Sequence, residues 1–271
     1  MEQSRALPTE VDLSRPSAAR VYDYFLGGAH NFEIDRQLAE QIAAMTPNLA
    51  DTMRAGRAFL RRAVAELTRL GVDQYLDIGS GIPTVGNVHE EAQGINPEAR
   101  IVYVDIDPVA VAHSRSILEG NPRTAVIQAD VRDPEHILAG ARETGLLDFD
   151  RPIGVLLAGV VHFVPDSDDP DRLMARLRDA MPPGSYLVIS HSTYEDQPQE
   201  MLDAQKLSAR TATEITLRSK AQVSAYFGDF ELLDPGVVHM PLWRPDSPDD
   251  VDDHPERFGA FGGVGRKSAV G

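Results

Sequence analysis

The sequence predicts an α/β protein with a mostly parallel sheet, helices on both of its faces, a helical N-terminal extension and an antiparallel edge. Before residue 72, apolar residues recur only at helical spacing. From residue 74 onward, short apolar runs alternate with helical stretches, which is typical of parallel strands joined by helices. Two closing apolar runs, Phe230–Leu233 and Phe261–Val264, supply the strands of the expected antiparallel edge.

The N-terminal region is expected to hold three helices after an irregular lead-in. Residues 1–16 mix proline, serine and charge without periodicity, so order is expected to begin near Ser17. The predicted helices are Ser17–Phe25, Asp35–Met45 and a longer helix that follows Pro47-Asn48 and ends at Gly71. We expect residues 1–50 to form a helical extension or lid, and residues 51–271 to form the main domain.

The main domain is expected to contain seven strands. The first five are short apolar runs, at Gln74–Ile78, Ile101–Val104, Ala125–Gln128, Gly154–Leu157 and Tyr186–Ser190. The helices between and after them are predicted at Thr84–Glu91, Val109–Leu118, Glu135–Ala141, Asp171–Met181, Glu200–Ala209 and Ser219–Tyr226. Together with the two closing runs, these elements make a doubly wound sheet.

Composition excludes several classes of protein. The 271 residues include 42 acidic and 26 basic side chains, a net charge of −16, and no cysteine. Disulfide frameworks and cysteine-ligated metal centres are therefore excluded. The acidic balance argues against binding to nucleic acid or to an anionic membrane.

Three further observations bear on location and metal binding. The start of the chain lacks the pattern of a secretory signal, and the longest apolar run, Ile153–Val164, is too short to span a bilayer. The acidic stretch from Asp246 to Asp253 lacks the glycine and the glutamate of a calcium loop. We therefore expect a cytoplasmic protein that binds no metal.

The most informative stretch is an apolar strand that leads into a glycine turn. Tyr75-Leu76-Asp77-Ile78 is followed by Gly79-Ser80-Gly81 and then by a predicted helix. Glycines at such a turn let the backbone bend tightly and let a ligand approach without a Cβ in the way. A plain strand-to-helix turn explains these residues equally well when they are taken alone.

Carboxylates after the next two strands support a ligand site. Asp105 follows the second strand, 24 residues after Gly81, where a nucleotide ribose offers two hydroxyls. Asp107 is a second candidate for this role. Asp130 and Val131 follow the third strand, where a carboxylate and an amide can meet an adenine ring, although a helix cap explains Asp130 equally well. These residues predict a ligand that contains adenosine.

Departures from the dinucleotide pattern indicate which adenosine ligand to expect. Thr84 stands where the third glycine of a dinucleotide turn would fall, and Pro83 removes an amide donor from a pyrophosphate cradle. Asp77 would repel a pyrophosphate but suits a ligand with a cationic ammonium and sulfonium. S-adenosylmethionine fits this description best. A nicotinamide or nucleotide-sugar enzyme is the weaker alternative.

Three motifs resemble the successive cofactor motifs of class I S-adenosylmethionine-dependent methyltransferases, namely Leu76–Gly81, Tyr103–Asp105 and Ala129–Val131. Two stretches resemble a narrower group, the actinobacterial S-adenosyl methyltransferase family. They are Pro16–Gly28 and Asp77–Thr84 with the following Asn87–Glu90. The resemblance extends from about Arg15 to Lys267. It implies a Rossmann-like class I methyltransferase fold and S-adenosylmethionine as cofactor, but it brings no known substrate.

The resemblance also implies roles for single residues. It places Gly79 and Gly81 under the methionine moiety, Asp77 near its amino group, Asp105 at the ribose, and Asp130 with Val131 at the adenine. Ala158, in the Leu157–His162 run after the fourth strand, is assigned to the same cofactor site. The acidic-Pro-Pro-Tyr pattern of enzymes that methylate nucleic-acid amino groups is absent. Its absence and the acidic charge disfavour a base-methylating enzyme.

His162 is the candidate catalytic residue. It follows the fourth strand at the expected catalytic edge, where it would deprotonate a hydroxyl, carboxyl or amine nucleophile. The alternative is a histidine that only shapes the pocket floor through local hydrogen bonds. His191, after the fifth strand, lies on the same rim and is the weaker candidate.

The segment from Tyr22 to Asp35 is the candidate lid. Gly27-Gly28 would supply a hinge, and the aromatic residues would exclude water from a closed site. The candidate substrate and lid residues are Tyr22, Tyr24, His30 and Asn31. Burial of a helix–loop–helix against the domain is the alternative explanation for the same residues.

The sequence therefore predicts transfer of the sulfonium methyl group to an unidentified, small-molecule acceptor. Positioning the acceptor in a dry pocket would supply most of the catalysis. A protein that binds S-adenosylmethionine as a sensor or regulatory module, without chemistry, is the alternative.

Overall fold

One mixed sheet lies at the centre of the fold. The computed structural model describes residues 15–46, 48–82, 86–197 and 215–268. Its strands are β1 (Gln74–Ile78), β2 (Arg100–Asp105), β3 (Thr124–Gln128), β4 (Gly154–Ala158), β5 (Tyr186–Ser192), β6 (Glu231–Leu232), β7 (Val238–His239) and β8 (Ala260–Arg266). The order is β3-β2-β1-β4-β5-β8-β6, with β7 paired to β8. The first five strands are parallel, and β8 runs antiparallel to β5, β6 and β7.

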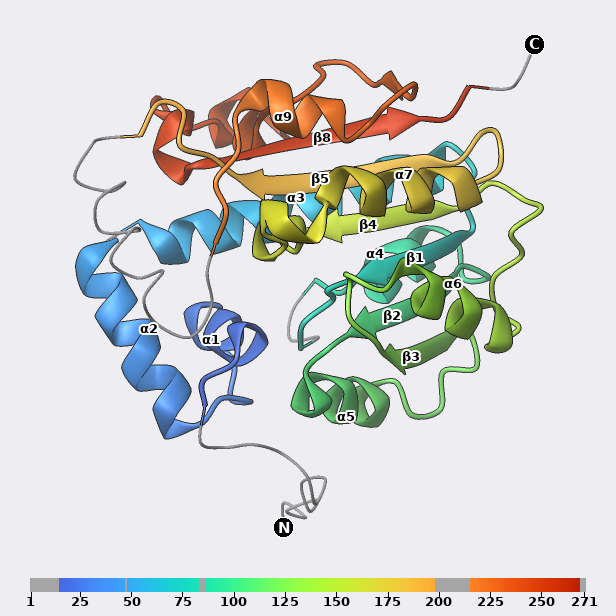
Figure 1. Cartoon of the computed structure of the whole chain (residues 1–271), viewed down its shortest axis with the longest axis horizontal. Helices are drawn as coiled ribbons and strands as arrows, with labels where there is room; N and C mark the ends of the chain where they lie inside the picture. Colours follow the sequence, from blue (N-terminus) through green and yellow to red (C-terminus); the bar gives the residue numbers. More distant parts are fainter. Residues whose placement is uncertain (1–14, 47, 83–85, 198–214, 269–271) are drawn as a thin grey trace.

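Helices cover both faces of this sheet and precede it (Figure 1). They are α1 (Ala18–Phe25), α2 (Glu33–Met45), α3 (Leu49–Arg69), α4 (Val88–Ile95), α5 (Pro108–Ile117), α6 (Pro134–Glu143), α7 (Pro170–Ala180) and α9 (Lys220–Ala225). Short 3-10 turns connect several of the later elements, among them Val161–Phe163. The predicted α/β fold with a parallel sheet and an antiparallel edge is thus confirmed.

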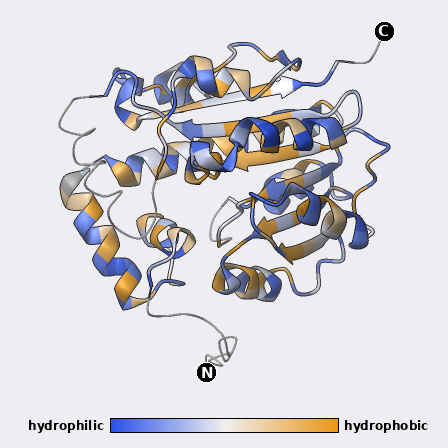
Figure 2. Ribbon diagram, in the orientation of Figure 1, coloured by the Kyte–Doolittle hydropathy of each residue, from blue (hydrophilic) through white to orange (hydrophobic). Residues whose placement is uncertain are grey.

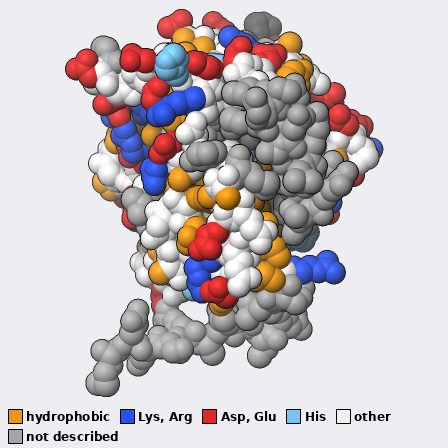
Figure 3. Space-filling model, turned by 90° about the vertical axis from the view of Figure 1, so that its left-hand side faces the viewer, with side chains coloured by type: hydrophobic (Ala, Val, Ile, Leu, Met, Phe, Trp, Pro, Cys, Tyr) orange, Lys and Arg blue, Asp and Glu red, His pale blue; other side chains and the backbone are white. Residues whose placement is uncertain are grey.

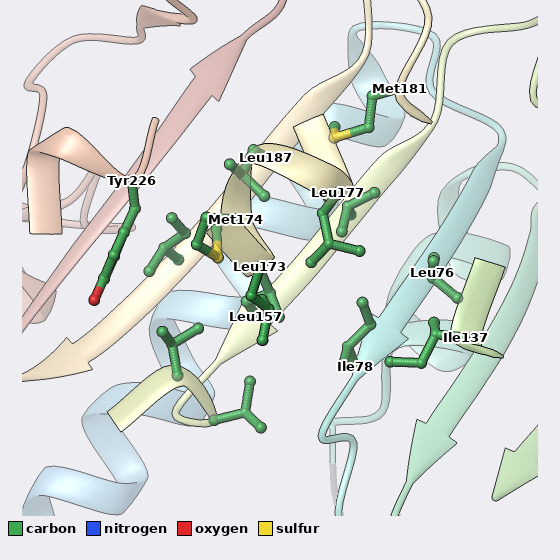
Figure 4. Close-up of a cluster of buried hydrophobic side chains, with 14 of the residues drawn as sticks. Leu76, Ile78, Ile137, Leu157, Leu173, Met174, Leu177, Met181, Leu187 and Tyr226 are labelled. Atoms are coloured by element: carbon green, nitrogen blue, oxygen red, sulfur yellow. The ribbon is translucent and has the colours of Figure 1, made fainter. Parts of the chain in front are cut away.

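Successive side chains of the strands pack alternately into two hydrophobic cores, one on each face of the sheet, because the side chains of a strand alternate between its two faces. Leu76 and Ile78 of β1 point into the core under α6, α7 and α9, whereas Tyr75 packs into the core under α3 and α4. Figure 4 shows Leu173, Met174 and Leu177 of α7 above the leucines of β4 and β5. The hydropathy colouring of Figure 2 shows apolar residues concentrated in the strands and on the inner sides of the helices.

The N-terminal helices stand apart from these two cores. A third, small cluster is formed by Val21 and Phe25 of α1 with Ala39 of α2. In Figure 1, α1 and α2 lie beyond the carboxyl ends of the parallel strands. This position puts the N-terminal segment at the edge where ligands bind in open α/β sheets.

Most predicted boundaries agree with the structure to within one or two residues, and three predictions need comment. The helix expected at Thr84–Glu91 begins instead at Val88, because the Asn87 amide is capped by the Glu90 carboxylate at 2.9 Å. Residues 83–85 and the predicted helix Glu200–Ala209 lie outside the described residues. The two-residue strand β7 was not predicted, so the sheet has eight strands rather than seven.

No helix in the described ranges is long and apolar enough to cross a bilayer.

Candidate cofactor and acceptor site

The glycine turn after β1 has the geometry that glycine alone tolerates well. Gly79 and Gly81 have φ angles of +73° and +65°. A Cβ on Gly79 would lie 2.4 Å from Cγ2 of Val160, so this glycine lets β1 turn against the segment after β4. A Cβ on Gly81 would meet no atom of the described residues within 4 Å. Gly81 therefore borders open space at the carboxyl edge of the sheet.

Asp105, the last residue of β2, ties its strand to this turn. Its Oδ2 accepts the Gly81 amide at 2.7 Å, and its Oδ1 accepts the Asp107 amide at 2.8 Å. Burial raises the pKa of Asp105 to about 6, although the backbone hydrogen bonds oppose that shift. The carboxylate is thus held in one orientation beside the open space.

Asp107 faces the same space. Its Oδ1 caps α5 by accepting the Val109 amide at 2.7 Å. Its Oδ2 is buried and has no hydrogen-bond partner, although Nη1 of Arg20 lies 3.6 Å away. The two ribose candidates therefore differ, because both oxygens of Asp105 already accept backbone amides and one oxygen of Asp107 is left over.

Asp77 is buried in β1 among groups of both signs. Its pKa is raised to about 7, because burial and the Asp105 carboxylate raise it by more than the Arg57 guanidinium lowers it. No described residue forms an ion pair with Asp77. A buried carboxylate without a cationic partner is costly, so this position suits a ligand that brings a positive charge.

Arg57 of α3 is a residue that sequence reasoning missed. Its Nε is buried without a hydrogen-bond partner, and its guanidinium lies 5.6 Å from the centre of the Tyr22 ring. A signal was present in the sequence, since Arg57 stands four residues after Met53 and three before Leu60, on the apolar stripe of α3. A charged residue inside an apolar stripe is a reason to look for a partner.

Six of the nine buried side-chain polar atoms that lack a hydrogen-bond partner among the described residues belong to this part of the molecule. Those in the glycine turn, at the starts of α4 and α5, in α3 and in the N-terminal segment are Ser80 Oγ, Asn87 Oδ1, Asp107 Oδ2, Arg57 Nε, Asp23 Oδ1 and His30 Nδ1. Each such atom costs about 1–3 kcal/mol when it is left without a hydrogen bond. Their concentration in one region fits a ligand with several polar groups, as S-adenosylmethionine has.

Asp130 and Val131 lie after β3, as predicted. Arg132 donates to the Asp130 carboxylate through its amide at 2.9 Å and through Nε at 3.0 Å. Burial opposes ionisation of Asp130, but the Arg132 contacts outweigh burial and hold its pKa below the usual value. Val131 packs against the larger core. Asp130 is therefore ionised and already engaged by a neighbour.

The loop between α1 and α2 is built around Asp23. Its Oδ2 accepts the His30 amide at 2.8 Å and the Asn31 side-chain amide at 2.9 Å. A Cβ on Gly28 would lie 2.0 Å from Asp23 Oδ1. Close packing against Asp23 therefore explains why residue 28 is a glycine, whereas the sequence alone suggested a hinge.

The other candidates of this segment divide into two groups. The Tyr22 hydroxyl donates to the Met53 carbonyl at 3.1 Å, and the His30 ring lies 4.2 Å from the ring of His113 in α5. Tyr24 instead points to α2, with its hydroxyl 3.5 Å from Glu40. Tyr22 and His30 thus contact the main domain, and Tyr24 does not join them.

Arg20, which sequence reasoning also missed, connects the N-terminal segment to α5. Its Nε donates to Asp35 at 2.8 Å, and its Nη1 approaches Asp107. Arg20 and Asp35 are both buried. The N-terminal segment therefore lies directly against Asp107, the carboxylate that follows β2.

His162 and His191 come together at the ends of β4 and β5. The His162 ring lies 5.8 Å from that of His191, and its Nδ1 is 3.3 Å from the Ser192 hydroxyl. Burial, together with the nearby His191 and Arg218, lowers the pKa of His162 to about 3. Ala158, the last residue of β4, pairs with Ser190 beside them. His162 is thus a neutral imidazole at physiological pH.

His191 is held by hydrogen bonds on both ring nitrogens. Arg218 Nη1 lies 3.0 Å from its Nε2, and because arginine only donates, Nε2 accepts and Nδ1 donates to the Ser192 carbonyl at 2.8 Å. Arg218, 2% exposed, also donates to the Val164 carbonyl at 3.0 Å and to Asp166 at 2.6 Å. His191 therefore supports the local structure and has no free nitrogen for chemistry.

Figure 3 shows basic and acidic side chains next to one another in the upper left of the face it displays. Ion pairs such as Arg61–Asp246 and Arg54–Asp51 join the charges along α3 and the loop beside it. The described residues also contain no group of three or more His, Asp or Glu that could hold a metal ion.

Comparisons with known proteins agree with this geometry. A family model described as S-adenosyl methyltransferase matches residues 4–268. None of the curated proteins matches the chain significantly.

Solved structures extend the comparison. A protein assigned as a methyltransferase from Thermobifida fusca YX is 42% identical, with a TM-score of 0.89 and coverage of 97% of this chain and 98% of that one. A DUF574 family protein from Streptomyces avermitilis MA-4680 is 38% identical, with a TM-score of 0.89 and coverage of 94% and 99%. The N-methyltransferase NodS from Bradyrhizobium japonicum WM9, in complex with S-adenosyl-L-homocysteine, shares the fold at 12% identity, with a TM-score of 0.52 and coverage of 86% and 98%.

The glycine turn, the carboxylates after successive strands and the match over nearly the whole chain lead to one conclusion. The chain belongs to the S-adenosyl methyltransferase family and has the class I methyltransferase fold.

Proposed function

We propose that the edge formed by β1, β2 and β3 binds S-adenosylmethionine, and that the protein transfers its methyl group to a small molecule held near the ends of β4 and β5. The concentration of unpartnered buried polar atoms around the glycine turn carries this proposal. Family membership supports the same cofactor. When bound, the cofactor supplies an electrophilic methyl group on sulfur.

Each proposed contact follows from the chemistry of a residue at this edge. Asp105 and the Oδ2 of Asp107, which has no hydrogen-bond partner, accept hydrogen bonds from the ribose hydroxyls. The backbone at Gly79 and Gly81 passes beside the methionine moiety, and Asp77 receives its ammonium group.

The adenine ring would lie farther along the edge. Asp130 accepts from the adenine amino group with lone pairs that Arg132 leaves free, while Val131 and Ala158 border the cofactor. Ile106, between the two ribose carboxylates, is 56% exposed and offers an apolar surface to the ring.

His162 is proposed to contact the acceptor. Because burial and Arg218 both oppose a positive charge on this ring, it is a weak base for removing a proton from a hydroxyl group. It serves better as a hydrogen-bonding residue that orients an acceptor already nucleophilic at neutral pH. Positioning and exclusion of water then provide most of the rate enhancement.

The N-terminal segment is proposed to act as a cover over the bound cofactor. Tyr22 contacts Arg57, Arg20 approaches Asp107, and the His30 ring meets His113. Its boundary with the main domain falls near residue 50, close to the start of α3. Slower hydrogen exchange in α1 on addition of S-adenosylhomocysteine would support this role, and unchanged exchange there would contradict it.

Calorimetric titration tests the cofactor assignment. The ligands are S-adenosylmethionine, S-adenosylhomocysteine and NAD, and the variants are Asp105→Ala and a control, Asp179→Ala, on an exposed face of α7. We expect the first two ligands to bind wild type and the control, and to bind Asp105→Ala at least tenfold more weakly. NAD binding, or equal affinity in both variants, would refute the assignment.

Methyl transfer is tested separately with fractionated metabolite pools. We expect at least one pool to accelerate conversion of S-adenosylmethionine to S-adenosylhomocysteine by the wild-type protein. Binding of the cofactor without conversion in any pool would favour the sensor alternative.

A further inference from the structure

Among the residues that the structure describes, Arg57 is a cation of α3 without an ion pair. We propose that Arg57 binds the carboxylate of the cofactor's amino-acid moiety while Asp77 binds its ammonium group, so that the two residues make the site selective for an intact amino acid. This inference rests on the proposed binding of S-adenosylmethionine. It adds a specificity-determining residue from a helix that lies outside the strand-end motifs.

Arg57 differs from its neighbours on the same helix. Arg54 pairs with Asp51, Arg61 pairs with Asp246, and Arg62 donates to the carbonyls of Trp243 and Met240 at 3.0 and 2.9 Å. Among the described residues, Arg57 has no ion pair, and its buried Nε has no hydrogen-bond partner. An unpaired arginine is unexpected in a chain with a net charge of −16, and a partly buried one needs an anion.

Arg57 and Asp77 are neighbours without being partners. The positive charge of Arg57 lowers the pKa of Asp77, yet among the described residues the two side chains form neither an ion pair nor a hydrogen bond, and the buried Nε of Arg57 has no partner. No hydrogen bond from a described residue reaches the Asp77 carboxylate. An amino-acid group carries its ammonium and carboxylate on one carbon atom. Placed between the two side chains, it would give each charge a charge-assisted hydrogen bond.

Tyr22 explains how the guanidinium can be held for this task. Its ring lies 5.6 Å below Cζ of Arg57, and its hydroxyl is fixed by the Met53 carbonyl at 3.1 Å. A guanidinium over the face of an aromatic ring is attracted to it and can still donate to a carboxylate. The amino-acid end of the cofactor would thereby also contact the N-terminal segment through Arg57.

The test compares ligands that differ only at the amino-acid end. S-adenosylhomocysteine has both charged groups, its decarboxylated analogue S-adenosyl-3-thiopropylamine keeps only the ammonium, and 5′-methylthioadenosine has neither. Their affinities are measured by calorimetry for wild type, Arg57→Ala, Arg57→Lys, Asp77→Asn and the control Arg54→Ala. Arg54 lies on the same helix and its pairing with Asp51 is exposed.

The expected result is a loss of discrimination. Arg57→Ala should bind S-adenosylhomocysteine at least tenfold more weakly than wild type does, and should no longer prefer it to the decarboxylated analogue. Its affinity for 5′-methylthioadenosine should stay within about twofold. Arg57→Lys should keep part of the preference because it keeps the charge. Asp77→Asn should weaken both ammonium-bearing ligands, and Arg54→Ala should change none.

Two outcomes would overturn the inference. An equal loss of affinity for all three ligands in both Arg57 variants would mean that Arg57 only supports the fold. A lower unfolding temperature of these variants without ligand would show the loss of stability independently. Unchanged preference for the carboxylate in Arg57→Ala would mean that another group binds it. Failure of the proposed function is a different result, because wild type itself would then bind none of the three adenosine ligands.

Discussion

The two halves of the carboxyl edge of the sheet differ in whether their buried polar groups have hydrogen-bond partners. Around β1 and β2, Asp107, Arg57 and Ser80 each keep a buried polar atom without a partner. Around β4 and β5, His191 and Arg218 are buried to a similar degree but form hydrogen bonds to each other and to nearby carbonyls.

This contrast separates groups that await a ligand from groups that hold the fold. A buried polar atom without a partner costs free energy in the empty protein and regains it when a ligand supplies the missing hydrogen bond. A buried network that is already complete rigidifies its surroundings instead. Variants of the β4–β5 half should therefore lose stability, whereas variants of the β1–β2 half should lose affinity.

The largest expected effect is on stability, from Arg218→Ala. Removing this side chain leaves His191 and the Val164 carbonyl unpaired in the interior. Asp166 is mostly exposed, so its ion pair contributes little of the loss. We expect the free energy of unfolding to fall by about 3–4 kcal/mol, as measured by urea denaturation.

The matched control for this prediction is Arg123→Ala, which removes an exposed ion pair with Glu98. It should change the free energy of unfolding by less than about 1 kcal/mol. Similar losses in the two variants would contradict the idea that the network around Arg218 holds the fold.

A smaller effect with the opposite sign is expected from Asp77→Asn without ligand. Burial raises the pKa of Asp77 from its ordinary 3.8 to about 7, so the folded protein holds a proton that the unfolded chain releases. The contribution of Asp77 to the free energy of unfolding of wild type therefore falls as the pH rises from 3.8 to about 7. Asparagine removes this penalty, and the variant should unfold at a higher temperature than wild type at pH 8 but not at pH 4.

The same substitution should weaken S-adenosylhomocysteine binding. A gain in stability together with a loss of affinity is the signature of a group kept for its ligand. A variant that is less stable than wild type at pH 8 would show that Asp77 instead supports the fold.

His162→Ala sharpens the comparison on the acceptor side. Because its pKa is lowered to about 3, the ring does not titrate near neutrality, so the pH profile of kcat between 5 and 8 should lack an inflection from it. With an acceptor found by metabolite screening, we expect kcat to fall about tenfold or more. Affinity for S-adenosylhomocysteine, measured by calorimetry, should stay within about twofold. A comparable loss of cofactor affinity would remove the acceptor-side role.

The smallest effect is expected from Arg132→Ala. This change frees the Asp130 carboxylate, which keeps enough lone pairs in wild type to accept another donor. Affinity for S-adenosylhomocysteine should change by no more than about threefold in a calorimetric titration. A change above tenfold would show that Arg132 controls access to the adenine end.

Predictions from local pattern succeeded where the signal was local. The strand Gln74–Ile78 was predicted with its observed bounds, because a buried parallel strand is a continuous apolar run that ends at a glycine turn. The start of α4 was missed by four residues because the Asn87–Glu90 cap outweighed the apolar pattern before it. The two-residue strand β7 has too little sequence to carry a period, and only pairing with β8 defines it.

The candidate site divides in the same way. The sequence by itself determined the fold class and the carboxylates at or just after the ends of β1, β2 and β3, because strand alternation and residue spacing fix which side chains reach one edge of a parallel sheet. Only the tertiary structure brought Arg57 and Arg20 to that edge, gave Gly28 its close contact with Asp23, and occupied both nitrogens of His191. These features depend on contacts between residues far apart in the chain or on how a side chain is buried, and neither is encoded in the spacing of a motif.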